Sequence, residues 1–270
     1  MTSPREVIAK GSKTFALASV FLPREMRSNI YTLYAWLRHC DDVIDSSNSS
    51  LTDLQNLKLQ LVDGTHEPIA AGLKTLIKDK NIPFVYFEEF FEGLRSDIEN
   101  KGYDTFSELE VYCYRVAGVV GLIFCSLSGV TNEQALKCAS ALGIGMQLTN
   151  ISRDVLEDAQ NKRIYLPRKL MEYQCTAQEM TESPSRSLVT VKYLLARAEE
   201  MYEKGNQGLR FLPFRVAIAV GCASFLYRAI GKKIIRNMPQ SLNERVVVGF
   251  PVKLRCLFLG LCAVIRSRFI

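Results

Sequence analysis

The chain has 270 residues, of which 48% are hydrophobic and 23% are charged, enough apolar material for the core of one large domain or two small ones. Its 34 lysines and arginines against 28 acidic residues give a net charge of +6, and no dense basic run indicates a nucleic-acid partner. We expect a cytoplasmic protein, because no apolar run approaches the roughly 18–20 residues that span a bilayer and residues 1–15 lack the apolar core of a signal peptide.

The first half of the chain has the apolar spacing of helices, and alternating strand patterns are nearly absent. One helix is predicted from Arg24, after Pro23, to about Asp45, and another from Phe84 to about Asn100. Two more begin at capping motifs: Thr105-Phe-Ser-Glu opens a helix that continues to Gly129, and Thr131-Asn-Glu-Gln predicts a capping box for a helix that continues to residue 159.

The second half continues the helical pattern beyond the loop T-E-S-P-S-R-S at 181–187. Helices are predicted over Leu188–Leu209 and Pro213–Met238, and a last one from about Val252. No proline falls between Pro83 and Pro167, where helical spacing is strongest. We predict an all-α fold with residues 1–270 as a single domain.

The cysteines and histidines argue against a zinc site. The eight cysteines are scattered, mostly within apolar segments, and no C-x-x-C motif occurs. Only His39 and His66 could add nitrogen ligands. We therefore expect buried, reduced thiols, and no histidine-based acid–base chemistry.

Two aspartates lie four positions apart in R-H-C-D-D-V-I-D at 38–45, directly after the apolar run that ends at Leu37. On a helix, Asp41 and Asp45 share a face, and two like charges at this spacing repel one another unless a positive charge lies between them. The sequence therefore raises the question of which cation that is.

A second acidic stripe follows in Q-L-T-N-I-S-R-D-V-L-E-D at 147–158. Gln147, Asn150, Asp154 and Asp158 are spaced by three, four and four residues, so their oxygens lie along one side of a helix. The neighbouring Leu148, Ile151 and Val155 would normally face a core, and polar groups pointing the same way need a buried partner.

Two interpretations of these stripes remain open. Among 28 acids in 270 residues, roughly three acid–acid pairs at this spacing are expected by chance. The arginines nearby, Arg38, Arg153 and Arg163, could simply form intrahelical salt-bridge clusters. Alternatively, oxygen-only ligands suit a hard cation such as Mg²⁺, which is commonly shared with substrate phosphates that arginine also binds. Two acidic faces across a helix bundle would then neutralise a departing diphosphate, so that a carbon–oxygen bond ionises.

Aromatic side chains could stabilise the resulting carbocation. The candidates are Phe15, Phe21, Tyr31, Tyr34, Tyr112, Tyr114 and Tyr227, although each could equally be plain core. The glycines of G-V-V-G at 118–121 and G-I-G at 143–145 could leave room for a long apolar substrate, or could serve close helix packing.

Four segments resemble the squalene/phytoene synthase family: G-S-K-T-F (11–15), L-Y-A-W-L-R-H-C-D-D-V-I-D (33–45), Y-C-Y-R-V-A-G-V-V-G (112–121) and Q-L-T-N-I-S-R-D-V-L-E-D-A-Q-N-K-R-I-Y-L-P (147–167). The resemblance extends from about residue 9 to about residue 255 and is strongest to the bacterial phytoene synthases. It implies an isoprenoid-synthase helical bundle around a central cavity. The implied activity, the first step of carotenoid biosynthesis, joins two molecules of geranylgeranyl diphosphate head-to-head through prephytoene diphosphate to give phytoene.

The resemblance also implies roles for individual residues. Asp41, Asp45, Asp154 and Asp158, with Asn150, would hold Mg²⁺ or Mn²⁺, and Gln147 would bind substrate on the same face. Family positions near the diphosphates correspond to Arg38, Arg153, Arg163 and Tyr165. Family positions in an N-terminal flap correspond to Ser12, Thr14 and Phe15. The reaction cavity would be bordered by Tyr34, Tyr112 and Tyr227. The released diphosphate would accept the last proton, and no NADPH is expected.

One position departs from the family pattern. The run N-M-P-Q-S-L-N-E-R lacks the aromatic residue that often precedes the arginine matching Arg245, so Arg245 is left out of the predicted site.

Two alternative functions stay open at this stage. A squalene or dehydrosqualene synthase would use farnesyl diphosphate, and the absence of a G-x-G-x-x-G motif does not exclude NADPH in this family. A non-catalytic assembly factor of the same fold is the alternative from another class, although all four aspartates are present. No obligate protein partner is indicated.

The C-terminal segment K-L-R-C-L-F-L-G-L-C-A-V-I-R-S-R-F-I contains four basic residues, no acids and an apolar centre too short to span a bilayer. It is either the last core helix or a peripheral contact with an anionic membrane, at the inner face.

Overall fold

The computed structural model describes residues 3–46, 49–64, 68–171 and 175–269, and these contain no β-strand. The all-α prediction is therefore confirmed. The α-helices are α1 (Pro4–Gly11), α2 (Lys13–Ser19), α3 (Arg24–Ile44), α4 (Leu51–Asp63), α5 (Pro68–Asp79), α6 (Val85–Glu99), α7 (Phe106–Cys113), α8 (Val119–Leu127), α9 (Glu133–Arg153), α10 (Val155–Gln160), α11 (Ala177–Glu182), α12 (Leu188–Asn206), α13 (Phe214–Arg236) and α14 (Phe250–Ser267).

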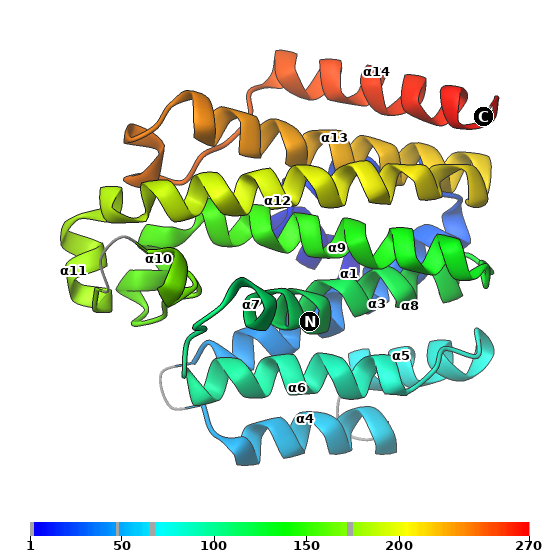
Figure 1. The fold of residues 1–270 in the computed structure, drawn as a ribbon. Helices are drawn as coiled ribbons and strands as arrows, with labels where there is room; N and C mark the ends of the chain where they lie inside the picture. Colours follow the sequence, from blue (N-terminus) through cyan, green and yellow to red (C-terminus); the bar gives the residue numbers. More distant parts are fainter. Residues whose placement is uncertain (1–2, 47–48, 65–67, 172–174, 270) are drawn as a thin grey trace.

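The long helices lie side by side in a layered bundle, with α14 at one edge and α4 at the other (Figure 1). Helix α9 packs against α12, α13 and α8, and α13 carries α14 on its outer side. The interface between α9 and α12 includes a buried hydrogen bond, 2.7 Å long, between the hydroxyls of Thr149 and Tyr202. This pairing satisfies two polar groups that would otherwise be costly to bury.

Two of the predicted helices have internal or terminal features that the sequence pattern did not indicate. The helix predicted from Thr105 to Gly129 contains a π-helical turn over Tyr114–Gly118, between α7 and α8. The predicted capping box at Thr131 is wrong, because the cap is Asn132, whose side chain accepts from the amide of Ala135. The helix predicted to reach residue 159 breaks at Asp154, where α9 gives way to α10.

The glycines at 121 and 143 serve close helix packing. A Cβ atom on Gly121 would lie 2.4 Å from the carbonyl oxygen of Ala139, and one on Gly143 would lie 2.2 Å from that of Ala117. These distances are impossible for real atoms, so both positions need glycine for α9 to approach the preceding helix. Both glycines also line the cavity described below, so close packing and a place at the cavity wall hold together.

Two helical stretches, Phe106–Leu127 and Phe214–Arg236, are long and apolar enough to span a membrane by length and composition. The expectation that no run approaches this length was therefore wrong for these stretches. Both are partly enclosed by the bundle, with 44% and 61% of their apolar windows buried. Such burial is typical of core helices.

The cysteines behave largely as predicted. All eight are free, six are buried, Cys175 is partly buried and Cys262 is exposed. His66 lies outside the described residues.

Candidate active site

A cavity of about 1230 Å³ opens within the bundle. It is lined by residues from the N-terminal helices, from α3 and α6 to α9, from the segment after α10, and from α13. All sixteen predicted site residues line it: Ser12, Thr14, Phe15, Tyr34, Arg38, Asp41, Asp45, Tyr112, Gln147, Asn150, Arg153, Asp154, Asp158, Arg163, Tyr165 and Tyr227. The fold thus brings residues that are up to 215 positions apart in the sequence, Ser12 and Tyr227, to the same cavity.

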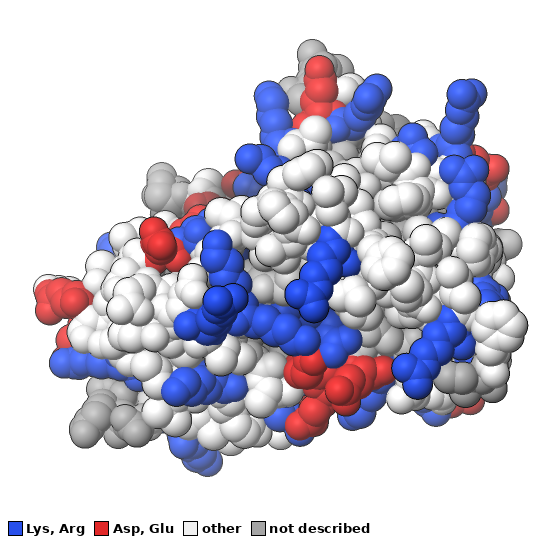
Figure 2. Space-filling view, turned by 90° about the horizontal axis from the view of Figure 1, so that it is seen from above, with Lys and Arg blue, Asp and Glu red and all other residues white. Residues whose placement is uncertain are grey.

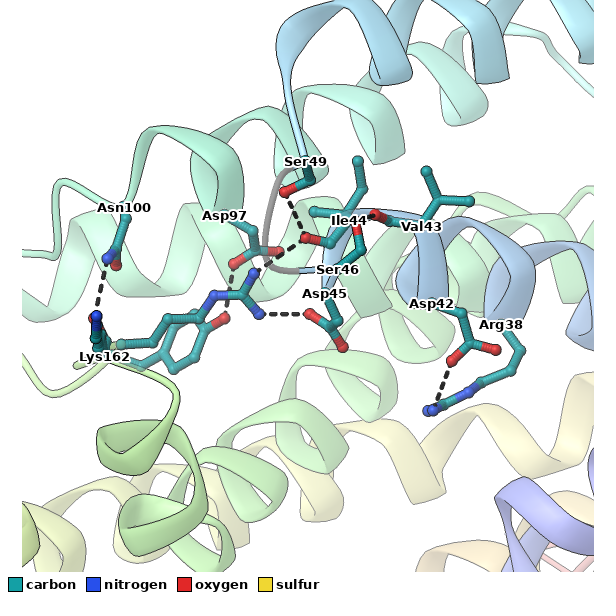
Figure 3. A network of polar contacts seen from close by, with 12 residues as sticks. Arg38, Asp42, Val43, Ile44, Asp45, Ser46, Ser49, Asp97, Asn100 and Lys162 are labelled. Carbon is teal, nitrogen blue, oxygen red and sulfur yellow. Dashed lines mark hydrogen bonds and ion pairs between the residues drawn. The ribbon is translucent and has the colours of Figure 1, made fainter.

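The first aspartate pair lies in the last turn of α3, where Asp45 is the C-terminal cap. Arg163, from the segment after α10, donates to Asp45 with Nη1 and Oδ1 2.5 Å apart. Arg38 instead pairs with Asp42, 2.7 Å away, and both of these side chains are exposed. Figure 3 shows the Arg38–Asp42 pair well apart from Asp45. The arginine next to the motif is therefore not the one that neutralises Asp45.

Asp41 has no ion-pair partner among the described residues. Burial, with the Asp45 carboxylate as a second cause, raises the pKa of Asp41 to about 7. The cavity thus contains a carboxylate whose charge the described side chains do not balance.

The second aspartate pair spans the junction of two helices. Arg153, the last residue of α9, binds the adjacent Asp154 with both ends of its guanidinium, at 2.8 Å and 2.5 Å. Asp158 lies one turn on in α10, and burial followed by the nearby Asp154 and Glu157 carboxylates raises its pKa to about 8. The pattern of the first pair therefore repeats: one aspartate is held by arginine and the other is not.

An amide completes this stripe. The Nδ2 of Asn150 donates to Gln147 Oε1 at 3.3 Å, while the buried Oδ1 of Asn150 has no hydrogen-bond partner. A buried acceptor without a donor is costly and marks a place for a ligand, a cation or water. Among the described residues, no three Asp, Glu, His or Cys side chains already converge on one point. The donor set therefore suits a cation held by one or two carboxylates that completes its shell with water and substrate oxygens.

The N-terminal segment covers one side of the cavity. Ser12 caps α2, accepting from the amide of Phe15 at 3.2 Å. The Phe15 ring packs on Tyr227 with ring centroids 5.5 Å apart, and its centroid is 6.4 Å from that of Tyr34. These contacts place three aromatic rings from three different helices at one wall. Three other candidates, Phe21, Tyr31 and Tyr114, are not among the residues that line the cavity, so the structure favours a packing role for them.

Two cavity residues were missed or set aside at the sequence level. Arg245 lies 3.5 Å from Asp154 and 3.3 Å from Glu157, so the side chain left out of the predicted site belongs to it. The correspondence of Arg245 to an arginine of the family was the signal in the sequence that could have placed it in the site. Asp97 accepts hydrogen bonds from Tyr112 and Tyr165, and no spacing in the sequence connected it to them.

A family model for squalene/phytoene synthases matches residues 8–251. The chain belongs to the squalene/phytoene synthase family. Its relatives include the 15-cis-phytoene synthase of Paracoccus sp. (strain N81106 / MBIC 01143), 34% identical over 97% of this chain and 91% of that protein. The 15-cis-phytoene synthase of Enterobacter agglomerans is also 34% identical, over 96% and 94%. These similarities confirm the resemblance inferred from the four motifs.

Solved structures agree with the family assignment. A dehydrosqualene synthase in complex with ligand superposes with a TM-score of 0.83, at 29% identity, covering 98% of this chain and 95% of that one. The squalene synthase HpnC from Alicyclobacillus acidocaldarius, at 24% identity, shares the fold with a TM-score of 0.75 over 89% and 93%. The helical bundle is therefore that of the squalene/phytoene synthases.

Proposed function

We propose that this protein is a phytoene synthase. It joins two geranylgeranyl diphosphates head-to-head through prephytoene diphosphate and releases two diphosphates and a proton. The observation that carries the proposal is that one cavity holds both aspartate pairs and the arginines Arg153, Arg163 and Arg245. The names of the 15-cis-phytoene synthases similar to this chain support the substrate and product.

Magnesium, or manganese, fits the donor set described above. Asp41 and Asp45 would hold it on one side of the cavity, and Asn150, Asp154 and Asp158 on the other. When bound, such an ion stabilises negative charge on the diphosphate leaving group.

The chain's own residues bind and orient the substrates in this proposal. Arg153 and Arg163, already pointed at the cavity by their aspartate partners, take up diphosphate oxygens through bidentate contacts. The prenyl chains lie along apolar lining residues that exclude water, among them Leu33, Phe90, Phe124, Met146, Leu209 and Leu212. The rings of Phe15, Tyr34 and Tyr227 stabilise positive charge on carbon. The released diphosphate accepts the final proton.

The experiment supplies purified protein with Mg²⁺ and either geranylgeranyl or farnesyl diphosphate, without NADPH, and identifies the hydrocarbons by mass. Phytoene from the longer substrate alone supports the proposal. Dehydrosqualene from the shorter one would favour the second candidate, to which the superposed dehydrosqualene synthase points. Squalene formed only after NADPH is added would identify a squalene synthase. A folded protein that converts neither substrate would favour a non-catalytic assembly factor.

The proposal includes a reversible contact between helix α14 and an anionic membrane, with the protein otherwise in the cytoplasm. Phe250, Leu254 and Phe258 lie along one side of α14 and are 72%, 51% and 65% exposed. No acidic residue follows Arg245, and four basic residues occur from Lys253 onward. Figure 2 looks down on this face and shows uncharged surface interrupted by lysines and arginines, with acidic clusters nearer the margin. A lipid surface with anionic headgroups complements both features.

The lining of the cavity reaches α14, since Lys253 and the preceding Val247 and Val248 belong to it. An apolar substrate in the membrane would therefore have a short path to the site. The double variant Leu254→Ser and Phe258→Ser should lose co-sedimentation with phosphatidylglycerol vesicles. Leu59→Ser, an exposed leucine on α4 at the opposite edge of the bundle, should keep it. Equal binding by both variants would exclude α14 as the contact.

A further inference from the structure

Asp97, in α6, is a cavity carboxylate held by two tyrosines. The hydroxyl of Tyr112 donates to it at 3.0 Å and 3.1 Å from the two carboxylate oxygens, and the hydroxyl of Tyr165 donates at 2.7 Å. Figure 3 shows Asp97 directed toward the same region as Asp45. Asp97, Tyr112 and Tyr165 all line the cavity, although Asp97 belongs to neither aspartate motif.

The two tyrosines form an aromatic stack with a third. The ring centroids of Tyr112 and Tyr165 are 5.2 Å apart, and Tyr103 lies 5.4 Å from Tyr112 and 6.3 Å from Tyr165. Burial and the nearby Asp97 carboxylate raise the pKa of Tyr112 and of Tyr165 well above the ordinary value. Both phenols therefore stay protonated, and each uses its single proton on Asp97.

The surroundings leave Asp97 with a negative charge close to the stack. Arg163 is the cation that attracts it, while Asp45 repels it. Burial raises the pKa of Asp97 to about 6, against the hydrogen bonds of the two tyrosines, so the group is largely ionised at neutral pH. A half-buried carboxylate is an expensive way to hold two hydroxyls if shape alone is needed, because a neutral acceptor would serve.

We propose that Asp97 is a positioning residue that polarises and orients the Tyr112–Tyr165 wall for a cationic prenyl fragment in the cavity. Each phenol donates its hydroxyl hydrogen bond to Asp97, which increases the electron density of the ring and leaves no hydroxyl proton facing the cation. The carboxylate behind the rings adds a fixed negative charge in a site that excludes water. This inference rests on the proposed function for the identity of the cation.

The test measures binding of a carbocation mimic rather than turnover. Geranylgeranyl-dimethylamine, protonated at neutral pH, and geranylgeraniol, its uncharged counterpart, are titrated by calorimetry into wild-type protein and Asp97→Asn with Mg²⁺ and inorganic pyrophosphate. We expect Asp97→Asn to bind the ammonium about tenfold more weakly than the wild type does, because one interaction with a charged group is lost. Its affinity for the alcohol should stay within about twofold of the wild-type value. Glu99→Gln, an acid at the exposed end of the same helix, should match the wild type for both ligands.

Several results would overturn the inference. Equal weakening for both ligands would show that Asp97 only supports the cavity's shape, and no weakening would show that its charge does not reach the ligand. A wild-type protein that does not prefer the ammonium over the alcohol would also overturn it. Asp97→Glu, which restores the charge, should recover part of the preference. Turnover of geranylgeranyl diphosphate by the wild type is assayed separately, so failure of the proposed function remains distinguishable.

Discussion

Arg163 and Asp45 join the two aspartate motifs directly, through a 2.5 Å contact between residues 118 positions apart. The Arg163 guanidinium also reaches the carbonyl oxygen of Ile44, at 3.4 Å, so it caps the end of α3 as well. Its side chain is 19% exposed, against 54% for that of Asp45. The segment that follows the second motif thus supplies the cation for the first motif, a charge that the residues around Asp45 in the sequence do not provide.

Replacing Arg163 should weaken diphosphate binding. We expect Arg163→Gln to raise the KM for a prenyl diphosphate about 10- to 100-fold, because one charge-assisted bidentate contact is lost. Arg168→Gln is the matched control, since Arg168 lies nearby in the chain and pairs with Asp104 outside the cavity. Steady-state kinetics on both variants checks the prediction. Indistinguishable KM values would mean that Arg163 serves only to hold α3.

The unbalanced carboxylate of Asp41 should make stability depend on pH. Because its pKa in the folded protein, about 7, lies above the ordinary value, the folded state keeps its proton longer, and stability falls as pH rises from about 4 to about 7. In metal-free buffer at pH 8, the unfolding free energy of Asp41→Asn should exceed that of the wild type by about 1–2 kcal/mol. This is less than the full pKa shift would give, because water in the cavity screens the charge of Asp41.

Thermal melts between pH 5 and pH 8 check this dependence. Asp79→Asn, an exposed aspartate at the end of α5, should follow the wild type across the range. A wild-type melting temperature that rises over this interval relative to Asp41→Asn would contradict the direction of the effect.

The packing of α9 against the helix before it should not tolerate a methyl group. Gly143→Ala would place a Cβ atom 2.2 Å from the carbonyl oxygen of Ala117, and we expect a loss of about 2–3 kcal/mol in unfolding free energy. Gly72→Ala, in α5, meets only the methyl group of Thr32 at 3.5 Å and should gain about 0.5–1 kcal/mol from helix propensity. Urea denaturation of both variants measures the difference. Equal stabilities would mean that the helices separate at little cost.

The arginine set aside at the sequence level should contribute to the second motif. Arg245→Gln removes contacts to Asp154 and Glu157, and we expect Mg²⁺-dependent pyrophosphate binding to weaken about tenfold. Arg236→Gln, at the exposed C-terminal end of α13, is the control. Calorimetric titration with pyrophosphate distinguishes them, and unchanged affinity in Arg245→Gln would exclude Arg245 from the ligand site.

The helices and the two aspartate motifs could be predicted because their signals are local. Apolar spacing and the position of Pro23 predicted α3 within one residue, and the four-residue spacing of Asp41 and Asp45 identified a shared face. Asp97 could not be found in this way, since its partners Tyr112 and Tyr165 are 15 and 68 positions away. The break at Asp154 also lacked a signal, because neither glycine nor proline occurs there and the next helix resumes at once.

Other features could not be decided from the sequence, because one sequence pattern suits two structures. The glycines at 121 and 143 are compatible with a roomy cavity and with tight packing, and in the structure they both pack closely against carbonyl oxygens and line the cavity. Arg38 could pair with Asp41 or Asp42, and in the structure it pairs with Asp42, at the four-residue spacing. Tertiary packing decides such cases.

The stoichiometry of diphosphate release tests the central claim most directly, that both aspartate pairs act on two substrates in one cavity. Purified protein, Mg²⁺ and geranylgeranyl diphosphate are incubated, and pyrophosphate and hydrocarbon are quantified together. The account predicts two pyrophosphates for each phytoene, and loss of both products in Asp41→Asn and in Asp154→Asn. One pyrophosphate for each prenyl alcohol, with no hydrocarbon, would contradict it.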